Sequence, residues 1–247
     1  VTAATQRINS NCRDKDNNCI KPSIAVHTVE NSKQLNTTVQ SKKWDLVVAV
    51  GTRAAELVNR LRVRTPVLYA LIPSRNYPGL REKSGSQHHS AIYVDQPIRR
   101  QLHLIQSAMP KRKRVGVLLG RYSSIGSRSL QQIMREMGLT PVIMRVSKNI
   151  GSSLEKIYSK IDVLLALPDP SVYNRQTVLK VLLSSYRHRV PVIGYSAAFV
   201  KSGATAGIYS TPRNIGQHIG DEVGGFFAAG KKRLSAPAYP SHFTVNT

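Results

Sequence analysis

Long apolar runs are missing from this sequence of 247 residues. No stretch approaches the roughly 20 consecutive apolar residues that a membrane-spanning helix needs. The first residues, from Val1 to Gln6, also lack the charged and apolar regions of a signal peptide. We therefore expect a globular chain from which any signal peptide has already been removed. The hydrophobic content of 41% is sufficient for substantial cores.

Acidic residues are scarce: 13 Asp and Glu stand against 36 Lys and Arg, which gives a net charge of +23. A charge of this size attracts polyanions such as nucleic acid or anionic lipid. The basic clusters lie mostly at helix ends and in loops, without the interleaved aromatic residues of a single-strand binder. Two interpretations stay open, a solvated basic surface and a selected contact with a polyanion or membrane surface.

Cysteine is nearly absent, and the two that occur, Cys12 and Cys19, lie close together in a polar segment. A zinc site would need two further ligands, and His27 is the only nearby candidate. We favour a local disulfide, which would contribute about 2.5 kcal/mol in the chain-entropy model and would require an oxidising compartment. Free thiols and a metal site remain the alternatives.

Catalytic motifs are missing as well. The seven histidines lack HExxH-type metal spacing. No Gly-x-Ser-x-Gly elbow, P-loop or Gly-x-Gly-x-x-Gly motif follows an apolar segment, and the few acids rarely form pairs suited to acid–base work. We therefore expect neither an enzyme nor a cofactor or metal site.

A repeated pattern is present instead, in which a short apolar segment is followed by a polar loop and an amphipathic helix. These segments are too short for helices and too uniformly apolar for a half-exposed sheet, so they indicate buried parallel strands. Ligands of open parallel sheets bind beyond the carboxyl ends of the strands. The five clearest segments are 45–50, 66–71, 114–119, 162–167 and 190–195.

Other elements follow from periodicity and turn residues. We expect a first strand over 23–29 and a long loop over 73–87 that acts as a lid or flap. Further strands are expected at 91–94, 141–146, 206–209 and 242–245. Helices are expected at 53–61, 96–109, 129–137, 154–161, 174–187, 197–202 and 215–229. The fold class is therefore α/β with two units that have parallel sheets.

Several phrases resemble the ABC-transporter substrate-binding family that includes tryptophan- and tyrosine-binding proteins, a branch of the type I periplasmic-binding fold. The resemblance covers about residues 22–247 and depends on all the phrases together. The phrases span 45–55, 101–110, 114–118, 161–169, 189–196, 199–204 and 214–222.

This resemblance implies two Rossmann-like lobes that close around a ligand at a hinge. One lobe would comprise 1–108 with about 211–231, and the other 109–210 with about 232–247. It also implies a periplasmic or extracytoplasmic location, an ABC permease and ATPase as partners, and a small-molecule ligand. We expect a monomer, with an additional anionic surface contact as an open possibility.

Nine residues at strand ends and helix starts are candidates for ligand binding. Thr52 can cap a helix whose first amides face an anion, although a plain helix cap would look the same. Asp169 follows a buried strand where the family places a polar residue that grips an amino group, but an Asp between two prolines is also a common turn residue. The nine candidates are Gly51, Thr52, Ser74, Arg121, Tyr122, Ser127, Asp169, Tyr195 and Ser196.

The loop over 120–127 departs from the Asn-Pro-x-x-x-Asn-Ser pattern usual in amino-acid-binding members of the family. Only Ser127 keeps its counterpart, while Arg121 and Tyr122 are new and could pair with or stack on a ligand. Solvent-facing loop residues and ordinary loop polarity are the alternative interpretations for this loop and for Ser74, Tyr195 and Ser196.

The function expected from these observations is an extracytoplasmic solute-binding protein of an ABC-type uptake system. It would capture a small polar ligand, amino acid-like or anionic, in a cleft between the lobes by hinge closure. Alternatives are a periplasmic ligand sensor that signals to a membrane receptor, and a basic polyanion-binding protein. A sensory domain of a transcription regulator is a weaker alternative, because the chain lacks a helix-turn-helix motif.

Overall fold

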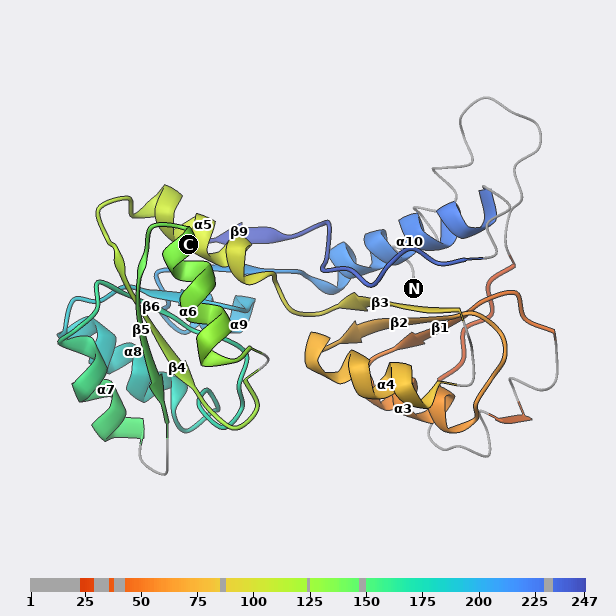
Figure 1. Ribbon diagram of the computed structural model, residues 1–247, viewed down its shortest axis with the longest axis horizontal. Helices are drawn as coiled ribbons and strands as arrows, with labels where there is room; N and C mark the ends of the chain where they lie inside the picture. The colour runs from red at the N-terminus through yellow and green to blue at the C-terminus, as the bar shows by residue number, and fades with distance from the viewer. Residues whose placement is uncertain are drawn as a thin grey trace. The chain divides into compact units, whose positions relative to one another are not determined.

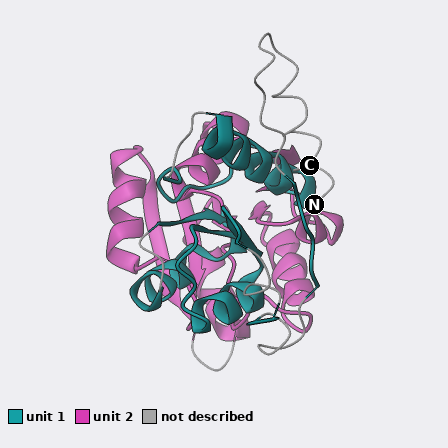
Figure 2. Cartoon of the chain, turned by 90° about the vertical axis from the view of Figure 1, so that its right-hand side faces the viewer, with its two compact units in different colours: residues 1–95, 210–243 teal, residues 96–209, 244–247 magenta. Residues whose placement is uncertain are grey.

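The computed structural model describes residues 23–28, 36–37, 43–84, 88–123, 125–146, 150–228 and 233–247. The chain divides into two compact units, each built around one sheet (Figure 2). Unit 1 comprises Val1–Asp95 and Ser210–Phe243, and unit 2 comprises Gln96–Tyr209 and Thr244–Thr247. The proposed disulfide between Cys12 and Cys19 lies outside the described residues.

The sheet of unit 1 has three parallel strands, β1 (Val47–Val50), β2 (Val67–Ile72) and β3 (His89–Tyr93), paired in that order. Its helices are α3 (Thr52–Arg60), η1 (Ser74–Asn76), α4 (Tyr77–Lys83) and α10 (Pro212–Ala228). One face of the sheet packs on α3 and α4, and the other on α10 (Figure 1).

Alternation along β2 explains why both faces of this sheet are covered. Tyr69 points into the cluster that contains Leu57 of α3, whereas Leu68 points into the cluster that contains Ile219 of α10. Successive side chains of a strand face opposite sides, so a strand without polar residues must be covered twice.

The sheet of unit 2 has six strands in the order β5-β4-β6-β7-β8-β9, parallel except for β9. The strands are β4 (Arg114–Leu119), β5 (Thr140–Arg145), β6 (Val163–Leu165), β7 (Val192–Gly194), β8 (Ala206–Tyr209) and β9 (Thr244–Asn246). The helices are α5 (Ile98–Ala108), α6 (Ser127–Glu136), α7 (Ile150–Tyr158), α8 (Val178–Arg187) and α9 (Ala197–Lys201).

The two faces of this sheet are also sorted by residue parity. Val117 of β4 belongs to the core cluster that contains Leu102 of α5 and Leu130 of α6. Its neighbour Leu118 belongs to the cluster that contains Ile157 of α7 and Val181 of α8. The sheet therefore lies between two helical layers, as expected for a parallel sheet.

Two expectations about unit 1 are wrong. Residues 23–28 form no strand, although 23–29 has the apolar composition of one. The described part of the expected loop over 73–87 is largely helical, in η1 and α4. Tyr77 and Leu80 are buried in the core of unit 1, and Pro78 lies in the first turn of α4, where proline is tolerated. Tertiary burial thus outweighs the turn signals of Pro78 and Gly79.

The boundaries between the units also differ from those expected. The helix over 98–108 was assigned to the first lobe, but Leu102 and Ile105 of α5 are fully buried in the core of unit 2. The segment before β9, up to Phe243, belongs to unit 1, where Ala238 forms an isolated parallel bridge with Ile92 of β3. A helix belongs to the unit in which it buries its apolar side, and for α5 that is unit 2.

Candidate functional site

The carboxyl end of the unit 2 sheet contains a topological switch point. From β4 the chain passes to β5 on one side, and β6 then pairs with β4 on the other side. The loops that follow β4 and β6 consequently leave the same edge of the sheet as neighbours. Ligand sites of open α/β sheets occur at such points.

Asp169 joins these two loops. Its Oδ2 accepts hydrogen bonds from the backbone N–H of Gly120 (3.1 Å) and of Tyr122 (3.0 Å) and from Ser123 Oγ (2.8 Å). Its Oδ1 accepts from the N–H of Ser171 (2.9 Å) and from Ser171 Oγ (2.5 Å). A carboxylate has about four lone-pair positions, so five donors leave none for a ligand.

The electrostatics agree with a charged, buried carboxylate. Burial would by itself raise the pKa of Asp169, but hydrogen bonds from Ser171 and Ser123 and from the backbone outweigh it, and the pKa is lowered. Only 1% of the residue is exposed. Asp169 therefore stays ionised at neutral pH and fastens the loops. The geometry favours this structural role over the expected grip on a ligand amine.

Gly120 is required by this packing. A Cβ at this position would lie 2.2 Å from Ser171 Oγ and 2.6 Å from Val172 Cγ2. The N–H of Arg121 next to it donates to Ser171 Oγ (3.0 Å), which adds a further link between the loops. The loop from Gly120 to Tyr122 is therefore held by backbone contacts, and the Oγ of Ser123 adds a side-chain hydrogen bond to the tie.

The side chains of Arg121 and Tyr122 are exposed beyond this tie, and Tyr122 is 45% exposed. Ser127 is the first residue of α6, whose N-cap is Gly126, and its first turn contains no acid. The positive end of a helix dipole and a guanidinium thus occur in one loop, which suits an anionic group.

Tyr195 and Ser196 follow β7 at the same edge of the sheet. Ser196 is the N-cap of α9, and its Oγ accepts a hydrogen bond from Phe199 N–H (3.2 Å). Tyr195 is partly buried, with its ring centroid 6.1 Å from Tyr173 and 5.2 Å from Phe199. Burial and the charge of Asp169 raise the pKa of Tyr195, so its hydroxyl stays neutral.

In unit 1, Gly51 and Thr52 connect β1 to α3. Gly51 is the N-cap, with φ of 90°, and its N–H donates to Ala70 O (2.8 Å). Thr52 is the first helical residue, so the expected cap at Thr52 is wrong by one position. Glycine is suited to this φ because it has no Cβ. The start of α3, like that of α6, contains no acid.

Ser74 follows β2 and is tied to the end of β3. Both its N–H (2.7 Å) and its Oγ (2.5 Å) donate to Asp95 Oδ2. The register of β2 and β3 shifts between Ala70 and Ile72, and Leu71 has a φ of 55°. Such bulges re-aim the end of a strand. The Ser74 hydroxyl proton is used within the unit, so Ser74 could meet a ligand only as an acceptor.

The sequence missed four residues of these networks: Asp95, Gly120, Ser123 and Ser171. Asp95 carries the same signal as Asp169, an acid just after a buried strand. Ser123 and Ser171 look like ordinary loop residues, and only the pairing of β4 with β6 brings them together. Six of the nine expected residues belong to unit 2 and three to unit 1.

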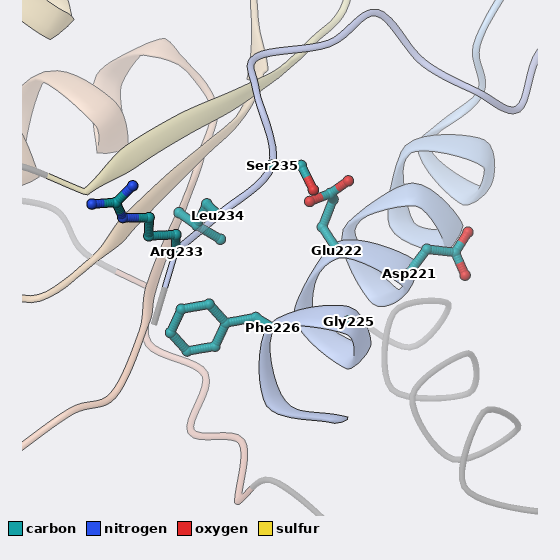
Figure 3. A pocket seen from close by; sticks show the side chains of 7 residues that line it. All are labelled: Asp221, Glu222, Gly225, Phe226, Arg233, Leu234 and Ser235. Carbon is teal, nitrogen blue, oxygen red and sulfur yellow. The ribbon is translucent and has the colours of Figure 1, made fainter. Parts of the chain in front are cut away.

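A small hollow in unit 1 lies apart from these residues. It is formed by the end of α10 and the segment 233–235, and Glu222 points toward Ser235 (Figure 3). Its volume of about 50 Å³ is far below the several hundred Å³ of typical ligand sites. It is lined by Asp221, Glu222, Gly225, Phe226, Arg233, Leu234 and Ser235.

The described residues show neither a metal cluster nor a helix that could span a membrane. They contain no group of three or more His, Cys, Asp or Glu side chains placed to hold a metal ion. Among their helices, none has both the length and the apolar character that a bilayer span demands.

Comparison with known families identifies the chain. The model of the ABC transporter substrate binding protein family matches residues 9–225. The chain belongs to this family. A search of curated proteins gave no match.

Solved structures of the family's fold cover almost the whole chain. A substrate-binding protein with adhesive properties from Clostridium difficile, in its ligand-free open form, is 18% identical (TM-score 0.72), with 99% of this chain and 85% of that chain covered. The ABC domain in complex with L-Trp from Streptococcus pneumonia is also 18% identical (TM-score 0.57; 99% and 87% covered). A conserved domain protein from Vibrio cholerae is 16% identical (TM-score 0.56; 99% and 86% covered). The family member described here has the type I periplasmic-binding-protein fold.

Proposed function

We propose that the protein is the extracytoplasmic solute-binding component of an ABC-type uptake system, and that it captures a small polar ligand at the carboxyl ends of its strands. The family match over residues 9–225 supports this proposal. A membrane permease and an ATPase would be its partners, and it would act by binding alone. The hinge closure expected from the family resemblance stays a prediction.

Among polar ligands, the geometry favours one that presents an anionic group such as a carboxylate. The observation that carries this preference is the saturation of Asp169 by five donors, which leaves it no role as an amine acceptor. The exposed Arg121 and the acid-free first turns of α3 and α6 remain as donors for an anion.

Aromatic side chains at the strand ends of unit 2 suggest what the rest of the ligand resembles. Tyr122 is exposed in the β4–α6 loop, and Tyr195 is half-buried after β7. An aromatic carboxylate could pair its charge with Arg121 and place its ring against a tyrosine. The Streptococcus structure holds L-Trp, a molecule with both features.

A thermal-shift screen of amino acids, aromatic carboxylates, dicarboxylates and inorganic phosphate tests the proposal. A ligand at about 100 times its Kd stabilises the folded state by about 2.7 kcal/mol. For a chain of this size, that corresponds to roughly 5–10 °C in Tm. A screen in which no solute of these classes raises Tm would contradict the proposal.

The Arg121→Gln variant tests the assignment of the anion. It should reduce the Tm shift of a carboxylate ligand and weaken binding by at least tenfold in calorimetry, because a hydrogen bond to a charged group contributes about 1.5–3 kcal/mol. Arg135→Gln, an exposed arginine in the last turn of α6, is the matched control and should bind normally. If both variants bind the ligand with equal affinity, Arg121 does not contact the ligand.

A further inference from the structure

An apolar stripe runs along the outer side of α8. Leu179 is 60% exposed, Leu183 49% and Tyr186 83%. Their spacing of four and three residues places them on one side of the helix. Single exposed apolar residues are common, whereas three large ones aligned on one side of a helix form a contiguous apolar stripe. We call Leu179, Leu183 and Tyr186 the α8 stripe.

The opposite side of α8 is firmly packed in unit 2. Val181 is fully buried and Leu182 and Ser185 are nearly so. Tyr158 of α7 donates a hydrogen bond to Val181 O (2.9 Å) and stacks on His188 with ring centroids 5.2 Å apart. The helix therefore already has its core contact, and the α8 stripe is additional to it.

Basic residues border the α8 stripe. Lys180 and Arg187 each follow a stripe residue and so lie along one flank of it, while Arg175 and Arg189 are exposed at its two ends. No acidic residue occurs between Asp169 and Asp221 in the sequence. The surface thus combines apolar and cationic groups without an acid of its own.

The acids elsewhere in unit 2 do not offset this charge. The unit contains eighteen Lys and Arg residues and four acids. Glu136 pairs with Arg99, Asp162 pairs with Arg114, and Asp169 is buried. The exposed Glu155 of α7 lies 3.4 Å from His188 Nε2, so one acid adjoins the C-terminal end of α8.

We propose that the α8 stripe and its basic border form a docking surface for an anionic lipid bilayer. Leucine side chains insert at the boundary between headgroups and acyl chains, and tyrosine and the long stems of Lys and Arg are suited to the same depth. Lipid phosphates supply the negative charge that the basic border lacks. A protein partner would need an acidic groove of matching shape, whereas a bilayer needs only this composition on a convex helix.

Vesicle flotation at physiological salt tests the proposal, with vesicles of phosphatidylcholine alone or mixed with about one third phosphatidylglycerol. The intact protein should float with the anionic vesicles only. The triple variant Leu179→Gln, Leu183→Gln, Tyr186→Ser should lose at least tenfold in partitioning with an unchanged Tm, because these residues are exposed. Lys180→Gln with Arg187→Gln should also bind about tenfold more weakly and show a flatter salt dependence.

The matched control replaces exposed apolar residues outside α8, Val94→Gln with Val245→Gln, and should float like the unaltered protein. Undiminished flotation of the triple variant would overturn the proposal, since the binding would then depend on net charge alone. Absence of flotation with the unaltered protein, or equal flotation with neutral vesicles, would overturn it too. Photo-crosslinking from position 186 to a protein rather than to lipid would reassign the surface to that partner.

Discussion

Replacing Asp169 by alanine should destabilise the protein by removing the tie between the loops after β4 and β6. The carboxylate accepts from Gly120, Tyr122, Ser123 and Ser171, and it is almost completely buried. In the variant these donors lose their shared acceptor. The perturbation is local, since Ala lacks only the carboxylate group and leaves the strands unaltered.

The expected loss is about 2–4 kcal/mol in the free energy of unfolding. Each hydrogen bond to a charged group contributes about 1.5–3 kcal/mol, but the five bonds share one carboxylate and do not add. Arg121, Tyr122 and Ser171 are exposed, so water can reach several of the orphaned donors. Asp169→Asn keeps the volume but presents an NH₂ group to donors, so we expect at least half of the same loss.

The pH dependence of the free energy of unfolding tests the same interaction in a second way. The folded pKa of Asp169 is lowered, so its stabilising contribution is present above the unfolded pKa of about 3.9 and is lost as pH falls through the folded value. The difference between the unaltered protein and Asp169→Ala should therefore shrink below about pH 4.

Urea unfolding followed by circular dichroism measures the loss, and hydrogen exchange of a peptide over 119–124 locates it. Glu155→Ala, an exposed acid of the same unit whose contact with His188 is a surface pair, is the control and should change stability by less than about 1 kcal/mol. A change of that small size for Asp169→Ala, with unaltered exchange of the loop, would refute the structural role of the carboxylate.

Three further substitutions test the strand ends by thermal unfolding. Gly120→Ala should cost about 1–3 kcal/mol because its Cβ would overlap Ser171 Oγ, whereas Gly126→Ala has open space and should be nearly neutral. Gly51→Ala should cost about 1–2 kcal/mol because of its φ of 90°, and a stability equal to the unaltered protein would show that the turn relaxes. Ser74→Ala should cost about 1.5–3 kcal/mol because the hydrogen bond from its hydroxyl to Asp95 is lost. An unchanged stability would show that this bond does not stabilise the protein.

The strands could be predicted well because burial on both faces leaves a continuous apolar run in the sequence. β4 (Arg114–Leu119) and β8 (Ala206–Tyr209) have the expected bounds, and the strand expected over 162–167 narrows to β6. The order β5-β4-β6 requires crossovers that no local pattern specifies. The repeated pattern predicted two α/β units, and the family resemblance supplied the expected assignment of residues to two lobes.

The helix α4 could not be predicted because its local signals oppose it. Pro78 and Gly79 are turn residues, and only two residues of the helix, Tyr77 and Leu80, are buried. Their burial against the unit 1 sheet decides the conformation. The segment 23–28 shows the opposite error, because its composition predicts a strand and the structure has none there. A strand also needs a neighbouring strand to pair with, which composition alone does not provide.

At the candidate site, the sequence located the strand ends but could not orient the side chains. Asp169 was correctly expected after a buried strand, yet its partner Gly120 is 49 residues away in the chain. Whether an acid faces a ligand or a neighbouring loop depends on that distant backbone. The N-cap at Gly51 rather than Thr52 has a similar cause, since the N–H of Gly51 pairs with Ala70 of the neighbouring strand.

The two units use the same device at their strand ends, a carboxylate that accepts hydrogen bonds from its own unit. In unit 1 the carboxylate of Asp95 holds Ser74, and in unit 2 that of Asp169 holds Gly120 and Tyr122. Each acid is occupied by donors from its own unit. Under the proposed function, the groups left for recognition are aromatic rings, the exposed side chain of Arg121 and the first turns of α3 and α6, which contain no acid. An anionic solute would satisfy these groups, whereas a cationic solute would first have to break a tie that holds the loops.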